Sequence, residues 1–331
     1  MEVAVSVPVY RDNGTLSRLL DSLASQSYKN FAINIIFKPS SDKNCDRRVF
    51  ETIDAHDNLD IKIIKQSAGR FEEAMNIAYG KIDADIIINT DGDAYASKSW
   101  VSDHVGLHNK YYSVGIATGL VIETRPEENY VVDKIGAFLD SQKWRMNRHT
   151  FIDRPIDKQF YNYGMYIGVS GMLVDTGKRF NMIKTFKQHG VNMSWKRDAL
   201  EGFKLPCYTK QGGRNEAAAA LEAIKRGFKA IWFKRGINYH PLHGSDSRST
   251  SISSLPLELT VESVLFSYYV SKFYDVNIRV LHWRTLIDNL IARIITLNKN
   301  YGYSLGYDIT KEAINSEWPP NKVRECEIES L

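Results

Sequence analysis

Short apolar runs alternate with amphipathic segments over the first third of the chain. The leucines between residues 16 and 23 recur at i, i+3, i+4 and i+7, which predicts a helix, and Phe71–Lys81 predicts another. Four runs rich in β-branched residues predict strands: Val3–Val9, Phe31–Phe37, Ile61–Ile64 and Ile86–Ile88. Strands that are apolar throughout and separated by helices favour an α/β fold, with a mostly parallel sheet flanked by helices.

The pattern loosens after residue 110. A strand is predicted over Val114–Ile122, a helix over Asn215–Arg226 and a further strand over Phe228–Phe233, whereas 125–165 gives no clear assignment. His243–Ser254 is rich in serine and predicts a loop.

Helical spacing dominates the last part of the chain. We therefore expect one domain over 1–255, with halves at 1–110 and 111–255, and a helical C-terminal extension over 256–331.

Two aspartates follow the isoleucine-rich strand. Asp91 and Asp93 are separated by Gly92, so both carboxylates can reach one ligand in the loop after the strand. Hard divalent cations such as Mg²⁺ or Mn²⁺ prefer oxygen ligands of this kind. Aspartate next to glycine is also common in ordinary turns. The motif alone leaves both interpretations open.

Composition narrows the class of protein. The 331 residues are 43% hydrophobic and 25% charged, and the net charge of +4 is far below that of a nucleic-acid binder. The three cysteines lie far apart, which disfavours a disulfide framework and favours a reducing compartment. The first residues do not read as a signal peptide, and we expect no transmembrane helix and a cytoplasmic location.

Five motifs in order resemble glycosyltransferase family 2, whose members have the GT-A, Rossmann-like fold. The first strand and helix read V-S-V-P-V-Y-R-D-N and L-L-D-S-L-A-S-Q-S-Y-K-N-F, and I-I-I-N-T-D-G-D-A matches the family's Asp-x-Asp element. Residues 190–197 read G-V-N-M-S-W-K-R, and N-E-A-A-A-A-L-E-A-I-K-R-G-F-K and Y-H-P-L-H-G-S follow. The resemblance covers about residues 3–250. It implies that 1–255 is a catalytic domain, with a nucleotide-sugar binding half (1–110) and an acceptor half (111–255).

The resemblance implies roles for the matched positions. Glu216 takes the place of the catalytic base, and Asp91, Asp93 and His240 take the place of the metal site for Mn²⁺ or Mg²⁺, with His243 as an alternative to His240. The remaining implied contacts are with the donor, through Pro8, Tyr10, Arg11, Phe37, Lys38, Arg70, Asp91 and Asp93, and with the acceptor, through Asn192, Trp195 and Arg197.

Two departures from the family pattern bear on the donor and the base. Phe37 and Lys38 stand where the family places aspartates, one of which pairs with uracil, so a guanosine- or thymidine-linked donor becomes more plausible. Asn215 and Glu216 replace Glu-Asp, which lengthens the base by one methylene. The processive signature Gln-x-x-Arg-Trp is absent, which favours transfer of a single sugar.

The resulting hypothesis is an inverting, non-processive, metal-dependent glycosyltransferase that moves a sugar from a nucleotide-diphosphate donor to a glycan or lipid-linked acceptor. The alternatives are a sugar nucleotidyltransferase and a non-catalytic nucleotide-sugar binding protein on the same scaffold. We expect no nucleic-acid partner. Residues 279–299 form a basic amphipathic helix that either touches an anionic membrane or packs on the protein.

Overall fold

The computed structural model describes residues 1–12, 14–124, 149–178, 180–241, 255–296 and 302–331. The chain folds as two compact units, which are described separately. The sheet unit comprises Met1–Pro126, Phe180–Leu205 and Ala219–Ser247, and the helical unit comprises Glu127–Arg179, Pro206–Ala218 and Arg248–Leu331. The predicted domain boundary at residue 255 stays a prediction.

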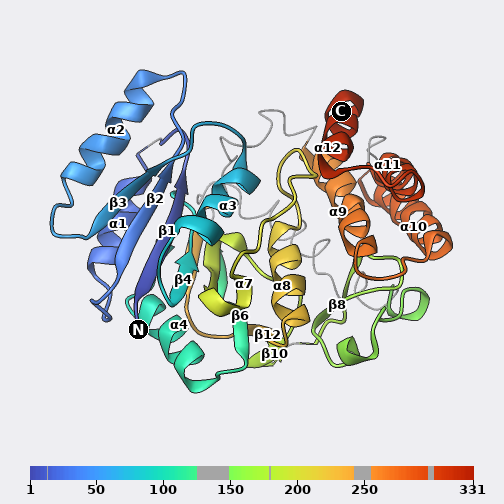
Figure 1. The fold of residues 1–331 in the computed structure, drawn as a ribbon, viewed down its shortest axis with the longest axis horizontal. Helices are drawn as coiled ribbons and strands as arrows, with labels where there is room; N and C mark the ends of the chain where they lie inside the picture. The colour runs from blue at the N-terminus through green and yellow to red at the C-terminus, as the bar shows by residue number, and fades with distance from the viewer. Residues whose placement is uncertain (13, 125–148, 179, 242–254, 297–301) are drawn as a thin grey trace. The chain divides into compact units, whose positions relative to one another are not determined.

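An eight-stranded sheet with the order β10-β12-β6-β11-β4-β1-β2-β3 forms the centre of the sheet unit (Figure 1). Its strands are β1 (Val3–Val9), β2 (Ala32–Phe37), β3 (Ile61–Lys65), β4 (Ile86–Asn89), β6 (Val114–Thr118), β10 (Met182–Lys184), β11 (Met193–Lys196) and β12 (Lys229–Phe233). The first four strands are parallel to one another, whereas β11 runs antiparallel between β4 and β6. The predicted α/β fold with a mostly parallel sheet is confirmed.

Amphipathic helices pack on this sheet. They are α1 (Leu16–Ala24), α2 (Lys43–Asp54), α3 (Phe71–Lys81), α4 (Trp100–Lys110), the short α7 (Arg197–Leu200) and the later turns of α8 (Asn215–Lys225). The four leucines of α1 are buried against β1 and β2, as their spacing predicts. Asp12 begins this helix, because its carboxylate accepts hydrogen bonds from the backbone N–H groups of Thr15 (3.0 Å) and Leu16 (3.1 Å).

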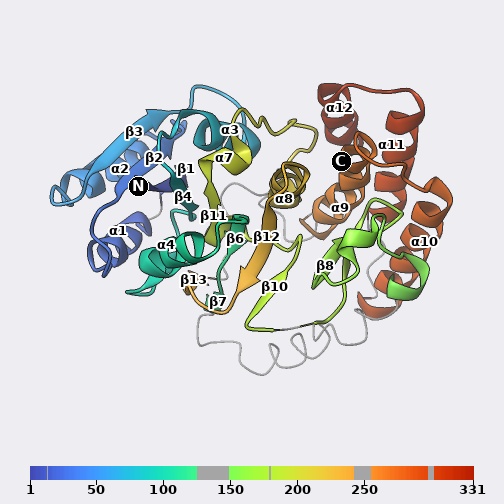
Figure 2. The same cartoon turned by 60° about the horizontal axis from the view of Figure 1, so that its bottom comes forward.

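The strand predicted over Val114–Ile122 divides into β6 and β7 (Val121–Thr124). Gly119 lies at the division, and a Cβ atom there would meet the carbonyl oxygen of Gly236 at 2.2 Å. The chain leaves the main sheet at this point, and β7 pairs with β13 (Asn238–Pro241), which also pairs with β5 (Tyr95–Ala96) (Figure 2).

A buried polar chain joins α4 to β11. His104 Nε2 lies 2.9 Å from Asn192 Oδ1, and Ser194 Oγ lies 2.7 Å from His104 Nδ1 and 2.9 Å from His108 Nε2. Because the amide oxygen of Asn192 only accepts, His104 donates from Nε2 and accepts from Ser194 at Nδ1. Burial lowers the pKa of His104 to about 4 and that of His108 to about 3, so both rings are neutral in the fold.

The helical unit contains most of the predicted C-terminal extension. In the part of this unit that the structure describes, the long C-terminal helices are α9 (Leu255–Ser271), α10 (Ile278–Thr296), α11 (Tyr303–Asn315) and α12 (Pro320–Ser330). They are accompanied by the short hairpin β8 (Met165–Ile167) and β9 (Leu173–Asp175) and the 3₁₀ turn η2 (Lys158–Phe160). Gly306 allows α11 to approach α9 closely, since a Cβ atom there would lie 2.8 Å from Val264 Cβ. The predicted helical character of 256–331 is confirmed over the described residues.

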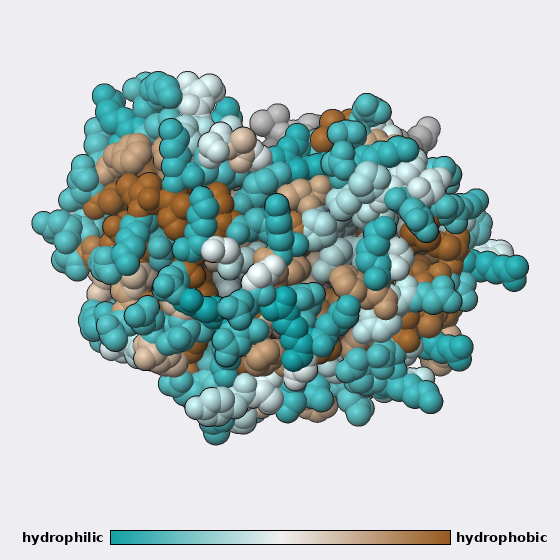
Figure 3. Space-filling model, viewed as in Figure 1, coloured by the Kyte–Doolittle hydropathy of each residue, from teal (hydrophilic) through white to brown (hydrophobic). Residues whose placement is uncertain are grey.

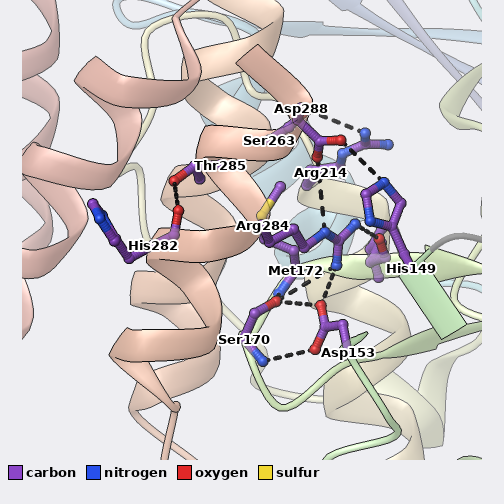
Figure 4. Close-up of polar contacts among 11 residues, drawn as sticks. His149, Asp153, Ser170, Met172, Arg214, Ser263, His282, Arg284, Thr285 and Asp288 are labelled. Atoms are coloured by element: carbon purple, nitrogen blue, oxygen red, sulfur yellow. Dashed lines mark hydrogen bonds and ion pairs between the residues drawn. The ribbon is translucent and has the colours of Figure 1, made fainter. Parts of the chain in front are cut away.

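A buried ion pair fixes α10 to the segment before β8. Arg284 is 5% exposed, and its guanidinium contacts the fully buried carboxylate of Asp153 and the carbonyl oxygen of Leu173 (Figure 4). Asp153 also accepts a hydrogen bond from the backbone N–H of Ser170 at 2.9 Å. Asp288, one turn after Arg284, lies 3.0 Å from His149 Nε2. These buried charges are paired, as their removal from water requires.

Among the described residues, none of the helices combines the length and the apolar character that crossing a bilayer requires.

Candidate active site

The loops after β1, β2 and β4 meet at one edge of the sheet. Parallel pairing aligns Ser6 with Asn89 and Val9 with Phe37, so the residues that follow these strands lie at the same carboxyl edge. Gly92 sits directly on β1, because a Cβ atom there would lie 3.7 Å from the carbonyl oxygen of Pro8. Ligands of open α/β sheets bind at this edge.

Asp91, Asp93 and His240 converge at this edge. The Nε2 atom of His240 lies 3.4 Å from Asp93 Oδ1 and 4.0 Å from Asp91 Oδ2, and one ligand atom from each residue lies within 4.8 Å of the others. Ligand atoms around an octahedral cation with bonds of about 2.1 Å are about 3 to 4.2 Å apart. The two carboxylates and the imidazole therefore fit one Mg²⁺ or Mn²⁺ ion after small side-chain adjustments.

Strand β13 delivers the imidazole to the two aspartates. The register pairs Tyr239 with Tyr95, so His240, the next residue of β13, is held near the segment after Asp93. The rings of Tyr95 and Tyr239 are stacked with centroids 4.9 Å apart. Asn238 is fully buried and donates from Nδ2 to Thr90 Oγ1 at 2.9 Å. The sequence did not predict a supporting role for Tyr95, Asn238 or Tyr239, although they adjoin predicted ligands.

The predicted donor contacts Tyr10, Arg11 and Lys38 also lie at the carboxyl edge. Lys38 Nζ lies 4.8 Å from the centre of the Tyr10 ring and donates to the carbonyl oxygen of Gly69 at 2.6 Å. The Arg11 guanidinium lies 5.2 Å from the same ring, and Arg11 adopts a positive φ of 56°. Arg70 is exposed and follows Gly69, so the structure brings these three cationic side chains to the loops near the end of β1.

Phe37, one of the implied donor contacts, is enclosed by its own sheet unit. Its side chain is 5% exposed and packs edge-to-face on Phe50, with ring centroids 5.0 Å apart. A strand of apolar residues directs alternate side chains into the core, and Phe37 points to that side. The structure therefore gives Phe37 a packing role.

The three predicted acceptor contacts have structural partners within the sheet unit. Asn192 is fully buried, accepts from Trp100 Nε1 at 2.8 Å and donates to Gly236 O at 2.7 Å. Trp195 is 1% exposed and packs edge-to-face on Tyr79. Both side chains are enclosed and cannot reach an acceptor.

Arg197 lies at the opposite edge of the sheet from the metal candidates. Its backbone N–H donates to the carbonyl oxygen of Asp85, before the start of β4, and its guanidinium contacts Asp83. Because β11 is antiparallel to β4, this motif runs away from the carboxyl edge. The structure thus gives Asn192 and Trp195 roles inside the fold, whereas acceptor binding by Arg197 stays a prediction.

Glu216 lies in the first turn of α8, within the helical unit, and is half-buried. The N-terminal end of a helix favours the ionised carboxylate. The alternative histidine, His243, and the predicted loop His243–Ser254 lie outside the described residues.

Comparison with known proteins agrees with this geometry. The sequence profile of Glycosyl transferase family 2 matches residues 4–173, more than half of the chain. No curated protein matches the whole sequence significantly.

Solved structures share the fold at low identity. The mannosyltransferase PcManGT from Pyrobaculum calidifontis, in complex with GDP-Man and Mn²⁺, is 15% identical with a TM-score of 0.53, over 82% of this chain and 64% of its own length. S. aureus TarS 1–349 in complex with UDP-GlcNAc is 14% identical with a TM-score of 0.53, over 92% and 76%. GalNAc-T7 with UDP, GalNAc and Mn²⁺ is 11% identical with a TM-score of 0.58, over 96% and 58%. This chain spans less than two thirds of the mannosyltransferase and of GalNAc-T7.

The matched profile, the mixed sheet with C-terminal helices and the acidic loop after β4 agree with one another, and the chain belongs to glycosyltransferase family 2, with a GT-A fold.

Proposed function

We propose that the protein is an inverting, non-processive glycosyltransferase that depends on Mn²⁺ or Mg²⁺. The observation that carries this proposal is the convergence of Asp91, Asp93 and His240 at the carboxyl edge of the sheet. A cation bound by these residues would stabilise the negative charge of the leaving nucleoside diphosphate.

Glu216 is the proposed base. Its carboxylate takes the proton of the acceptor hydroxyl while the hydroxyl oxygen attacks the anomeric carbon. The bond from this carbon to the diphosphate oxygen breaks as the new glycosidic bond forms, so the configuration inverts. A positioned carboxylate speeds such a step by typically about 10²–10⁴-fold.

The donor side favours a nucleotide other than uridine. Asp42 is the first carboxylate after β2 in the sequence, and it accepts hydrogen bonds from the backbone N–H groups of Asn44 and Cys45 at the start of α2. Lys38 can donate to an acceptor atom of a base or to a phosphate. We therefore propose a guanosine- or thymidine-linked sugar.

Thermal shift measures donor binding directly, because a ligand that binds only the folded state raises the Tm. GDP, dTDP and UDP are compared with and without Mn²⁺. We expect the largest Mn²⁺-dependent shift with GDP or dTDP, and a larger shift with UDP would refute the donor proposal. Donor turnover by the purified protein with Mn²⁺ separates an active transferase from a non-catalytic binding protein.

For the acceptor we propose a glycan, or a lipid-linked glycan that the protein meets at an anionic membrane. The outer face of α10 supports the second: Trp283, Leu286 and Leu290 are 61%, 42% and 59% exposed, and Arg279 is exposed beside them. In Figure 3 hydrophobic surface is visible where Figure 1 draws α10. Exposed tryptophan and leucine next to arginine are typical of helices that lie on anionic lipid.

A further inference from the structure

The loop before α8 is held by carboxylates of the C-terminal helices. Glu262 of α9 accepts hydrogen bonds from the backbone N–H groups of Gln211 and of Gly213, the latter at 2.6 Å. Glu327 of α12 accepts from the backbone N–H of Lys210 at 2.7 Å. Three backbone N–H groups in a four-residue stretch thus donate hydrogen bonds to two buried carboxylates, each 0% exposed.

The backbone of this loop can adopt only a narrow set of conformations. Gly212 has a φ of +85°, and a Cβ atom on Gly213 would lie 2.3 Å from Glu262 Oε2. Arg214 has a φ of 68°, which is unusual for a residue other than glycine. The Arg214 guanidinium donates to Ser263 Oγ at 3.1 Å, next to Glu262. Such backbone strain persists only where surrounding contacts over-determine it.

The buried carboxyl of Glu262 also interacts with that of Glu327. Burial raises the pKa of the Glu262 carboxyl, although the two backbone donors oppose this shift. Glu258, one turn earlier in α9, binds the Lys210 ammonium at 2.8 Å and the Gln211 amide at 2.9 Å. Glu258 therefore contacts side chains of the loop, whereas Glu262 contacts its backbone.

We infer that Glu262 is a positioning residue that fixes the orientation of Glu216 for proton transfer by holding the backbone of residues 211–213. Only three residues separate Gly212 from Glu216, so a displacement of the loop moves this carboxylate. A displacement of about 1 Å can cost about 10²-fold in rate when a reacting group must be in line. The inference rests on the proposed role of Glu216.

The test compares steady-state kinetics of Glu262→Gln with those of Glu258→Gln, its matched control. Glutamine keeps the size of the side chain but presents an NH₂ group to one of the two backbone donors. We expect kcat to fall by about 10-fold or more for Glu262→Gln, with the KM for the donor within about twofold of wild type. Glu258→Gln should keep kcat within about threefold, because glutamine can still accept a hydrogen bond from the Gln211 amide and Glu258 does not hold the loop backbone. Equal losses in both variants, or an unchanged kcat for Glu262→Gln, would overturn the inference.

A double mutant shows whether Glu262 acts through the base. If Glu216→Gln already abolishes transfer, adding Glu262→Gln should lower the residual rate no further, because the two residues act as one unit. A further loss of about 10-fold would contradict the positioning role. An active Glu216→Gln variant would instead overturn the proposed function, so the two failures are distinguishable.

If Glu262→Gln fails to fold, Gly213→Ala disturbs the same contact from the side of the loop. Its new Cβ atom would meet Glu262 Oε2, and the same fall in kcat is expected at an unchanged donor KM. Gly106→Ala controls for the added methyl group, because no atom lies within 4 Å of its Cβ position and, like Gly213, it does not adopt a positive φ. Similar kinetics for the two alanine variants would overturn the inference.

Discussion

At the scale of single residues, the proposed chemistry divides between carboxylates with different tasks. Asp91 and Asp93 share a loop and face His240, whereas Glu216 begins a helix. A cation ligand and a proton acceptor respond differently to loss of charge, which allows the two roles to be separated by kinetics.

Glu216→Gln keeps the shape of the side chain and removes its basicity. We expect kcat to fall by about 10²-fold or more, with donor binding nearly unchanged. Steady-state kinetics with a saturating donor measure the first quantity, and the Mn²⁺-dependent thermal shift measures the second. If most of the activity remains, the base is another carboxylate.

Asp93→Asn weakens one ligand of the proposed cation. We expect weaker Mn²⁺ binding by calorimetry and a higher donor KM together with a lower kcat, because the cation also holds the diphosphate. The same logic predicts that excess EDTA abolishes transfer and that added Mn²⁺ restores it. Asp85→Asn, at the other end of β4, is the matched control, and full transfer activity in excess EDTA would contradict the prediction.

At the scale of elements, buried polar groups join helices to strands. The histidines of α4 contact β11 through Ser194, and Asn192 holds the turns around Leu120 and Gly236. These turns lead into β7 and β13, so the buried amide that first suggests acceptor binding supports the strand that carries His240.

The neutral histidines predict a dependence of stability on pH. The unfolded chain takes up protons near pH 6.5, whereas the fold holds His104 and His108 neutral down to about 4 and about 3. The unfolded state therefore binds more protons in acid, and the free energy of unfolding should fall below about pH 6.5 by about 1.4 kcal/mol per pH unit for each histidine. Urea titrations between pH 7 and pH 5 measure the slope, and His108→Gln should reduce it. An unchanged slope in this variant would show that other groups dominate.

The ion pair of α10 makes a second prediction at this scale. Arg284→Met removes the guanidinium that neutralises the buried carboxylates of Asp153 and Asp288. The free energy of unfolding should therefore fall by about 3–5 kcal/mol. Chemical denaturation measures the loss, and Arg279→Met, on the exposed face of the same helix, should change it by less than about 0.5 kcal/mol. Adding Asp153→Asn to Arg284→Met should recover part of the loss. Equal stability of the two arginine variants would contradict this account.

At the scale of the whole molecule, the exposed face of α10 predicts weak membrane association. We expect the protein to float with vesicles that contain anionic lipid at low salt, and to be released at high salt because screening weakens the attraction. Trp283→Ser combined with Leu290→Ser should abolish flotation. The control Ile63→Ser changes a 43% exposed residue of β3 in the sheet unit and should have no effect. Dimerisation without flotation would assign this face to a second copy of the chain.

Periodicity was sufficient to predict β1 to β4, α1, α3 and the C-terminal helices, because burial of one face dictates the spacing of apolar residues. The break between β6 and β7 was not predictable, since it depends on contact of Gly119 with Gly236, far away in sequence. Motif order predicted the residues of the metal trio. The burial of Asn192 and Trp195 could not be predicted from the sequence, because a polar or aromatic residue in a motif looks the same in the sequence whether its side chain is enclosed or exposed.

Strand β13 has a consequence for how the protein is made. Asp91 and Asp93 leave the ribosome well before His240, and β13 is the last strand of the sheet unit in chain order. A nascent chain that ends before residue 238 therefore offers a cation two carboxylates without the imidazole. Tight Mn²⁺ binding should appear late in synthesis, when β13 docks between β5 and β7. Cation affinity of chains stalled at successive lengths would thus report when the sheet unit is complete.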